Sequence, residues 1–112
     1  MRRDAIVGLG TIAVDRIRRV PRVIGPDEKV RAGPVEIRPG GATVNHLAWA
    51  ACLGTRASFL GVVGRDAEAR FMRKAMDRAG IDRGGVKTLS GATAVSEIFV
   101  DPEGERAIYM DF

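Results

Sequence analysis

The chain has 112 residues, enough for one domain that buries roughly 65% of its unfolded surface. With 46% hydrophobic and 29% charged residues, its composition is that of a globular protein and excludes a disordered chain. The net charge of +4 raises the question of nucleic acid. The densest basic cluster, Arg16 to Arg22, contains no aromatic residue for base stacking, so we expect no nucleic-acid partner.

No stretch approaches the roughly 18 consecutive apolar residues of a membrane span. The first ten residues lack the small-residue cleavage site of a signal peptide. Cys52, the only cysteine, cannot form an internal disulfide, and we expect it to be a small buried hydrophobic residue. These features predict a cytoplasmic protein without a membrane partner.

Two short apolar runs, Ala5 to Gly10 and Ala57 to Val63, have the pattern of strands that are buried on both faces. The segments Val14 to Val20 and Lys29 to Ile37 lie between them and carry charges on one side. We expect these two segments to form a half-exposed antiparallel pair.

Two helices are predicted. The first is the alanine-rich run Val44 to Leu53, which stops at Gly54. The second spans about Ala67 to Ala79, with Asp66 as N-cap and Gly80 after its end. Its apolar stripe has helical spacing and predicts packing against a core; the stripe consists of Phe71, Met72, Ala75, Met76 and Ala79.

In the last part of the chain, the residue pattern predicts a short strand at Val86 to Leu89 and then a hairpin. Ala94 to Val100 leads into the turn Asp101 to Gly104, and the chain returns from Arg106 to Asp111. Doubly buried strands need helices on both faces and neighbours on both edges. We therefore expect the front part of something larger, or an obligate partner of another chain.

Gly8 to Ala13 matches the pattern GxGxxA after a strand, which is typical of dinucleotide-binding folds. That motif needs a helix at the glycines and an acid ending the next strand about 20 residues on. Here the residues that follow, Val14 to Pro21, are β-branched and charged. The motif is therefore weak evidence. No zinc spacing and no GxxxxGK[ST] loop occurs, so no metal site is expected.

The glycine pair Gly40 and Gly41 lacks Cβ atoms and precedes the first helix, whose first turn has unpaired N–H groups and partial positive charge. Asn45 would add a polar amide to that turn. These residues suit a small, oxygen-rich ligand or a tight loop before an ordinary core helix. Asp15 can accept two hydroxyl hydrogen bonds, or be a turn acid. His46 has no triad partner and is expected to be a surface or packing residue.

Taken together, these residues resemble the N-terminal part of the ribokinase-like (PfkB) carbohydrate kinases. The resemblance runs over nearly the whole chain, through VGLGTIAVD, RPGGATVN, FLGVVGRD, AGID and VDPEGERAIYMDF. The family's first signature is occupied with correct spacing by Gly40, Gly41, Asn45, Gly54 and Gly64. Thr43 and Leu47 depart from it, because small residues are usual at both positions.

The resemblance implies an α/β fold with a Rossmann-type, three-layer α/β/α core, of which residues 1–112 are the incomplete N-terminal portion. A protruding β-sheet lid would come from about residues 16–37 and 93–110, close over the sugar and make a homodimer contact. The resemblance also implies that the sugar is bound by Asp15, Gly40, Gly41 and Asn45. Ala13 stands where ribokinases often carry a sugar-contacting Asn.

In this family the catalytic aspartate, the anion hole and the site for ATP and Mg²⁺ lie in the C-terminal half. The resemblance thus implies no catalytic, cofactor-binding or metal residue within residues 1–112. We expect the N-terminal fragment of an ATP-dependent sugar kinase that is inactive alone. Two alternatives stay open: a non-catalytic module that binds sugars or dimerises through its lid, and a nicotinamide-dinucleotide-binding domain.

Overall fold

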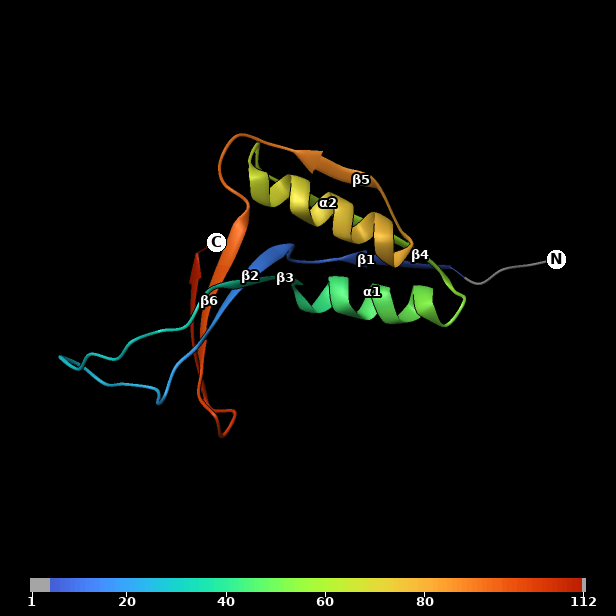
Figure 1. The fold of residues 1–112 in the computed structure, drawn as a ribbon. Helices are drawn as coiled ribbons and strands as arrows, with labels where there is room; N and C mark the ends of the chain where they lie inside the picture. The colour runs from blue at the N-terminus through green and yellow to red at the C-terminus, as the bar shows by residue number, and fades with distance from the viewer. Residues whose placement is uncertain (1–4, 112) are drawn as a thin grey trace.

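The computed structural model describes residues 5–111, which form two sheets and two helices (Figure 1). The parallel core sheet has the order β1-β4-β5 and consists of β1 (Ala5–Leu9), β4 (Arg56–Val63) and β5 (Ile81–Thr88). The protruding sheet has the order β3-β2-β6-β7 and consists of β2 (Ala13–Arg19), β3 (Glu36–Gly40), β6 (Ala94–Val100) and β7 (Arg106–Asp111). The radius of gyration is 16.2 Å, against roughly 13 Å for a compact domain of this length, because the second sheet extends away from the first (Figure 1).

The two helices follow their sequence signals closely. α1 spans Ala42–Cys52 and α2 spans Ala67–Ala79. The carboxylate of Asp66 caps α2 by accepting a hydrogen bond from the Ala69 N–H at 2.9 Å. Gly80 ends α2 with a φ of +76°, as the sequence predicts. Neither of these described helices is long and apolar enough to cross a membrane.

The core lies between the helices and one face of the core sheet. Phe59 of β4 and the two methionines of α2, Met72 and Met76, are fully buried there. Leu47 of α1 and Val14 of β2 join the same cluster. The predicted apolar stripe of α2 is thus confirmed as its packing face, and β2 is anchored in the core at its first residues.

The opposite face of the core sheet is open, and the expectation of strands buried on both faces is wrong for this chain. Val7 and Leu9 of β1 are 64% and 78% exposed, and Val62 of β4 is 55% exposed. The physical reason is that α1 and α2 share one hydrophobic cluster and so cover the same face. A continuous apolar run is suited to a strand covered on both faces, but the 107 described residues cover only one face of this sheet.

The excursion between β2 and β3 also differs from its prediction. Lys29 to Val35 is irregular, and β3 begins only at Glu36. Pro34 lacks an N–H for a ladder, and the N–H of Gly33 donates to the carbonyl of Arg19, at the end of β2, at 2.8 Å. β5 is longer than expected, because its residues between Ile81 and Val86 are polar or glycine and hide the strand.

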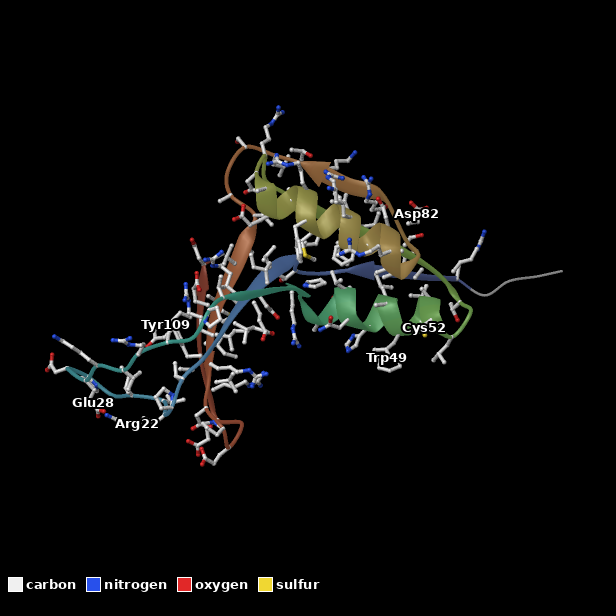
Figure 2. The ribbon with its side chains drawn as sticks, in the orientation of Figure 1. Arg22, Glu28, Trp49, Cys52, Asp82 and Tyr109 are labelled. Carbon is white, nitrogen blue, oxygen red and sulfur yellow. The ribbon has the colours of Figure 1, made fainter. Side chains whose placement is uncertain are left out.

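Cys52 is exposed, so its predicted burial is wrong. The face of α1 that meets the core is formed by Val44, Leu47, Ala48 and Ala51. Cys52 lies at the end of the helix, outside that face, and the side chain of Trp49 also points away from the sheet and is 69% exposed (Figure 2).

The strand pairings of the protruding sheet are largely as predicted. β2 and β3 are antiparallel, and β6 and β7 form the expected hairpin. At its turn the carboxylate of Asp101 accepts hydrogen bonds from the N–H groups of Glu103 and Glu105, at 3.0 and 2.9 Å. The parallel pairing of β2 with β6, which joins the two halves of this sheet, was not predicted from the sequence.

Gly41 makes the turn from β3 into α1 with a φ of +98°. A Cβ there would also collide with the carbonyl oxygen of Thr11. Gly54, after α1, has a similar φ of +94°, but a Cβ there would have no atom within 4 Å. A side chain at Gly54 would therefore meet backbone strain alone, whereas a side chain at Gly41 would meet both backbone strain and steric overlap.

We expect Gly54→Ala to lower the free energy of unfolding by about 1–2 kcal/mol, the cost of a left-handed conformation. Gly41→Ala should cost about 1–3 kcal/mol more, because overlap with the Thr11 carbonyl adds to the strain. Urea unfolding of the full-length protein measures both. Equal costs for the two variants would mean that the contact between Gly41 and Thr11 is not present in solution.

Candidate functional site

The candidate site is centred on Asp15, the third residue of β2. The register of the protruding sheet pairs Asp15 with Arg38 of β3 and with Ser96 of β6. Directly paired residues project from the same face of a sheet. Asp15, Arg38 and Ser96 therefore form one row across three strands.

Gly40 lies against the carboxylate of Asp15. A Cβ at Gly40 would be 2.6 Å from the Asp15 Cγ and closer still to one carboxylate oxygen. Gly40 is itself paired with Ala13, two residues before Asp15. Any side chain here would displace the carboxylate, so the first glycine of the pair is needed for a close approach rather than for a turn.

Within residues 5–111, no donor is placed to hydrogen-bond the Asp15 carboxylate. Burial raises the pKa of Asp15 above its ordinary value, and the positive charge of Arg106 partly opposes this shift. Neither of these influences is a hydrogen bond. A partly buried carboxylate that lacks donors is stabilised by any ligand that supplies hydroxyl or N–H groups.

The start of α1 adds a second polar feature directly after Gly40. Gly41 is the N-cap residue, and no side chain caps the helix or places an acid in its first turn. Asn45 lies one turn into α1, where its N–H bonds to the Gly41 carbonyl at 3.2 Å and its side chain is exposed. The structure thus places Asp15, Gly40 and Gly41 together, with Asn45 one helical turn further on.

Sequence reasoning missed the row neighbours of Asp15. Ser96 is 7% exposed and lies 81 positions further along the chain. The pairing of β2 with β6 is parallel and long-range, and no local pattern encodes its register. Arg38 pairs with Glu36 at 2.9 Å on the same strand, an i, i+2 spacing that the sequence does show.

Other motifs do not form sites. The glycines of GxGxxA are followed by β2 rather than by a helix, so the dinucleotide reading of that motif is wrong. His46 is exposed on α1, as expected. Within residues 5–111 no group of three or more His, Cys, Asp or Glu side chains is placed to hold a metal ion.

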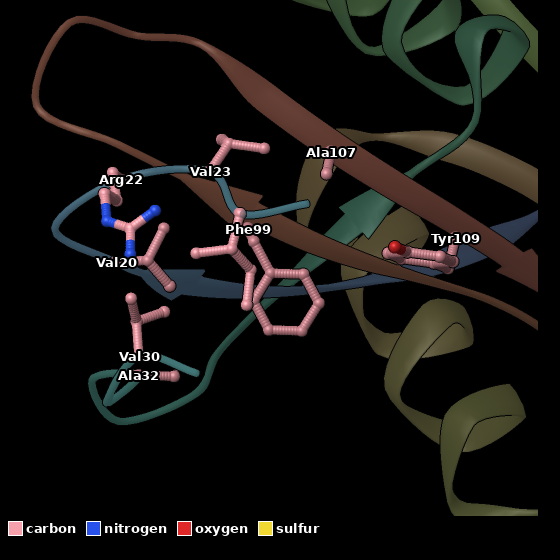
Figure 3. A pocket seen from close by; sticks show the side chains of 9 residues that line it. Val20, Arg22, Val23, Val30, Ala32, Phe99, Ala107 and Tyr109 are labelled. Atoms are coloured by element: carbon pink, nitrogen blue, oxygen red, sulfur yellow. The ribbon is translucent and has the colours of Figure 1, made fainter. Parts of the chain in front are cut away.

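Two of the cavities near the protruding sheet lie in different places. One, of about 340 Å³, opens at the carboxyl ends of the core strands and is lined by residues that include Gly10, Gly64 and Thr93. Ligands of open α/β sheets bind at this edge. The other, of about 330 Å³, is lined by apolar side chains that include Val20, Phe99 and Tyr109 (Figure 3). Ile98 and Ile108 project from the same face of the sheet as Asp15. Phe99 and Tyr109 are their neighbours along the strands and project from the opposite face, so this cavity faces away from Asp15.

Comparison with known proteins gives a consistent result. A family model described as pfkB family carbohydrate kinase matches residues 3–112. The chain is 29% identical over 109 residues to a ribokinase of Haemophilus influenzae, covering 96% of this chain and 36% of that protein. It is 33% identical over 106 residues to fructokinase-1 of Zea mays, covering 93% of this chain and 31% of that protein.

A solved structure of Arabidopsis thaliana ribokinase complexed with ribose and ATP superimposes with a TM-score of 0.82 at 21% identity. The match covers 98% of this chain and 36% of that chain, and it shows a shared fold. The chain thus spans about a third of the length of the proteins it matches. The ribokinase-like α/β fold expected from the motifs is confirmed, and the chain belongs to the pfkB family of carbohydrate kinases.

Proposed function

We propose that the full-length protein transfers a phosphoryl group from ATP to a sugar hydroxyl, and that this chain supplies the sugar-binding portion. The observation that carries the proposal is the carboxylate of Asp15, which lies against Gly40, is partly buried and accepts no hydrogen bond from the part of the chain that the structure describes. A polyol offers the donors that this carboxylate lacks. The names of the matched relatives make ribose and fructose the first sugars to assay.

Asp15 would bind the sugar by accepting hydrogen bonds from two hydroxyls. Each such bond to a charged acceptor is worth roughly 1.5–3 kcal/mol. Gly40 and Gly41 would contact the same sugar, and the missing Cβ of Gly40 leaves room for the Asp15 carboxylate beside them. The free N–H groups of α1 and the amide of Asn45 would contact the same sugar.

The protruding sheet would act as a lid, from about residues 16–37 and 93–110. Its Asp15 face includes Ser96 and Ile98, which are 7% and 8% exposed. Closure over the sugar would exclude water, which otherwise competes with the sugar hydroxyl as phosphoryl acceptor. Movement of this sheet would therefore change the affinity for the sugar. It would also change the share of phosphoryl groups that are transferred to the sugar rather than to water.

ATP with Mg²⁺ would bind to the remainder of the protein. Mg²⁺ prefers carboxylates and phosphate oxygens, and within residues 5–111 no group of three or more His, Cys, Asp or Glu side chains is placed to hold a metal ion. Phosphoryl transfer also requires charge stabilisation at the transferred group and a base for the hydroxyl. We propose that these groups belong to the remainder of the protein, that residues 1–112 alone do not catalyse transfer, and that the enzyme is cytoplasmic.

Asp15→Asn in the full-length protein should lower kcat/KM for the sugar by about 100-fold or more, because the neutral amide replaces a charged double acceptor. The KM for ATP should stay within about twofold, since Asp15 would not touch the nucleotide. Steady-state sugar-dependent ATP turnover provides both values.

The matched control is Asp82→Asn, at an exposed carboxylate of β5 that accepts a local hydrogen bond from the Gly84 N–H. It should behave as the parent protein. Equal kinetics for Asp15→Asn and the parent would remove Asp15 from the site. Sugar binding that depends on Asp15 without ATP turnover would favour a non-catalytic sugar-binding module instead.

The raised pKa of Asp15 predicts a pH dependence. Sugar binding needs the ionised carboxylate, so affinity should be lost as pH falls through a pKa that lies above that of an ordinary Asp. Arg106 lowers this pKa, so Arg106→Gln should move the loss of affinity to higher pH. Titration calorimetry with the sugar at several pH values measures the shift. Arg78→Gln, on exposed α2 surface, removes the same charge and should leave the pH profile unmoved.

We also propose that the lid pairs with the lid of a second copy. Tyr109 and Met110 of β7 are 67% and 65% exposed, on an edge strand beside the apolar cavity of Figure 3. Burial of such residues against an identical surface would be favourable by about 25 cal/mol per Å². Tyr109→Glu should convert a dimer to a monomer in sedimentation analysis, whereas Trp49→Glu on α1 should not. A parent protein that sediments as a monomer would contradict this assembly.

A further inference from the structure

The point where the chain enters β6 is tied to the start of α2 by a partly buried hydrogen-bond network. Thr93 immediately precedes β6 and is 5% exposed. Its N–H donates to Asp66 Oδ2 at 2.8 Å, and its hydroxyl donates to Asp66 Oδ1 at 2.6 Å. The same hydroxyl oxygen accepts a hydrogen bond from the Gly64 N–H at 3.0 Å. We call Gly64, Asp66 and Thr93 the hinge clamp.

These bonds exceed what capping of α2 requires. A helix N-cap needs one acceptor for a first-turn N–H, which Asp66 already provides to Ala69. Its second oxygen, Oδ2, accepts the Thr93 N–H, and Oδ1 accepts the Thr93 hydroxyl in addition to the Ala69 N–H. Burial acts to raise the pKa of Asp66, but the hydrogen bonds from Thr93 and Ala69 outweigh it and lower the pKa below the ordinary value. The carboxylate is therefore ionised at neutral pH, and its bonds to Thr93 are charge-assisted.

Backbone packing holds the same place. A Cβ at Gly64 would lie 2.8 Å from the Thr93 nitrogen and would collide with the Gly91 carbonyl oxygen. The segment before β6 is thus pressed directly against the end of β4. Together, the clamp bonds and this contact fix where β6 leaves the core.

The position of β6 matters for the candidate sugar site. β6 is an inner strand of the protruding sheet, between β2 and β7. Ser96, three residues after Thr93, is paired with Asp15. A change in the exit angle of β6 at Thr93 would be carried along the strand and would move the Asp15 row relative to Gly41 and α1.

We propose that Asp66 and Thr93 are positioning residues that set the angle between the protruding sheet and the core, and so the geometry of the sugar site. Neither residue needs to touch the sugar for this role. The inference rests on the proposed sugar site for its kinetic consequence, but the hinge clamp is a property of the fold that can be measured without any substrate.

Thr93→Val removes the clamp hydroxyl and keeps the shape of the side chain. In the full-length protein it should raise the sugar KM about tenfold, as expected for loss of roughly one hydrogen bond's worth of preorganisation, with the ATP KM within about twofold. Thr93→Ser keeps the hydroxyl and should restore the sugar KM to within about threefold of the parent value. Asp66→Ser retains an N-cap acceptor for α2 but lacks the second oxygen, and should resemble Thr93→Val.

A substrate-independent measurement completes the test. Spin labels on exposed Cys52 of α1 and on Glu103→Cys at the hairpin tip report the distance between core and lid, in full-length protein otherwise free of reactive cysteines. The distance distribution should be broader in Thr93→Val than in Thr93→Ser or the parent. If Thr93→Val lowers only the melting temperature and leaves the distribution and the sugar KM unchanged, the clamp is merely structural and the proposal fails. A broadened distribution in a protein that turns over no sugar would uphold the clamp and overturn the proposed function instead.

Discussion

The contact between the Asp15 carboxylate and the backbone of Gly40 is the constraint on which the candidate site depends. The antiparallel pairing of β2 with β3 creates it, and the absence of a Cβ at Gly40 permits it. The same β3 then turns at Gly41 into α1, so an acceptor of hydrogen bonds and the uncapped start of a helix are set side by side. Groups of opposite polarity within one small volume suit a polyol, whose hydroxyls both donate and accept.

The alternation of β2 links this site to the hydrophobic core. Val14 is 1% exposed and packs in the core cluster, whereas its neighbour Asp15 projects from the opposite face. A slip of one residue in the register of β2 would bury the carboxylate in the core and expose the valine. The cost of that exchange fixes the register, so the apolar packing of Val14 with Phe59 and Met72 also determines where Asp15 lies.

Local chemistry made part of this arrangement predictable. Asp66 and Gly80 bound α2 because capping uses groups within a few residues, and the turn at Asp101 is encoded in the same way. The double glycine marked the turn into α1, because the positive φ of Gly41 and the lack of space for a Cβ at Gly40 are conditions that glycine meets without strain. Ser96 could not be found, because its place beside Asp15 depends on a parallel pairing across 81 positions. The burial of Val7 and Leu9 was misjudged for a related reason: an apolar strand shows what its faces tolerate, not which elements cover them.

The junctions between the two sheets restrict how the protruding sheet can move. Ile12, before β2, is 4% exposed in the core cluster; Gly41, after β3, packs on the Thr11 carbonyl; and Thr93, before β6, is held by Asp66. Two crossings are thus tied to core elements next to the strands they serve, and the third, at Gly41, packs on the neighbouring crossing at Thr11. The strands beyond them are joined to one another by continuous ladders, so bending within the sheet would break pairings that rotation about the junctions would keep. Motion should therefore be that of a rigid sheet about a narrow line of contacts. If the sheet rotates in this way, a small change at the hydrogen-bonded Thr93 would displace side chains several residues further along β6.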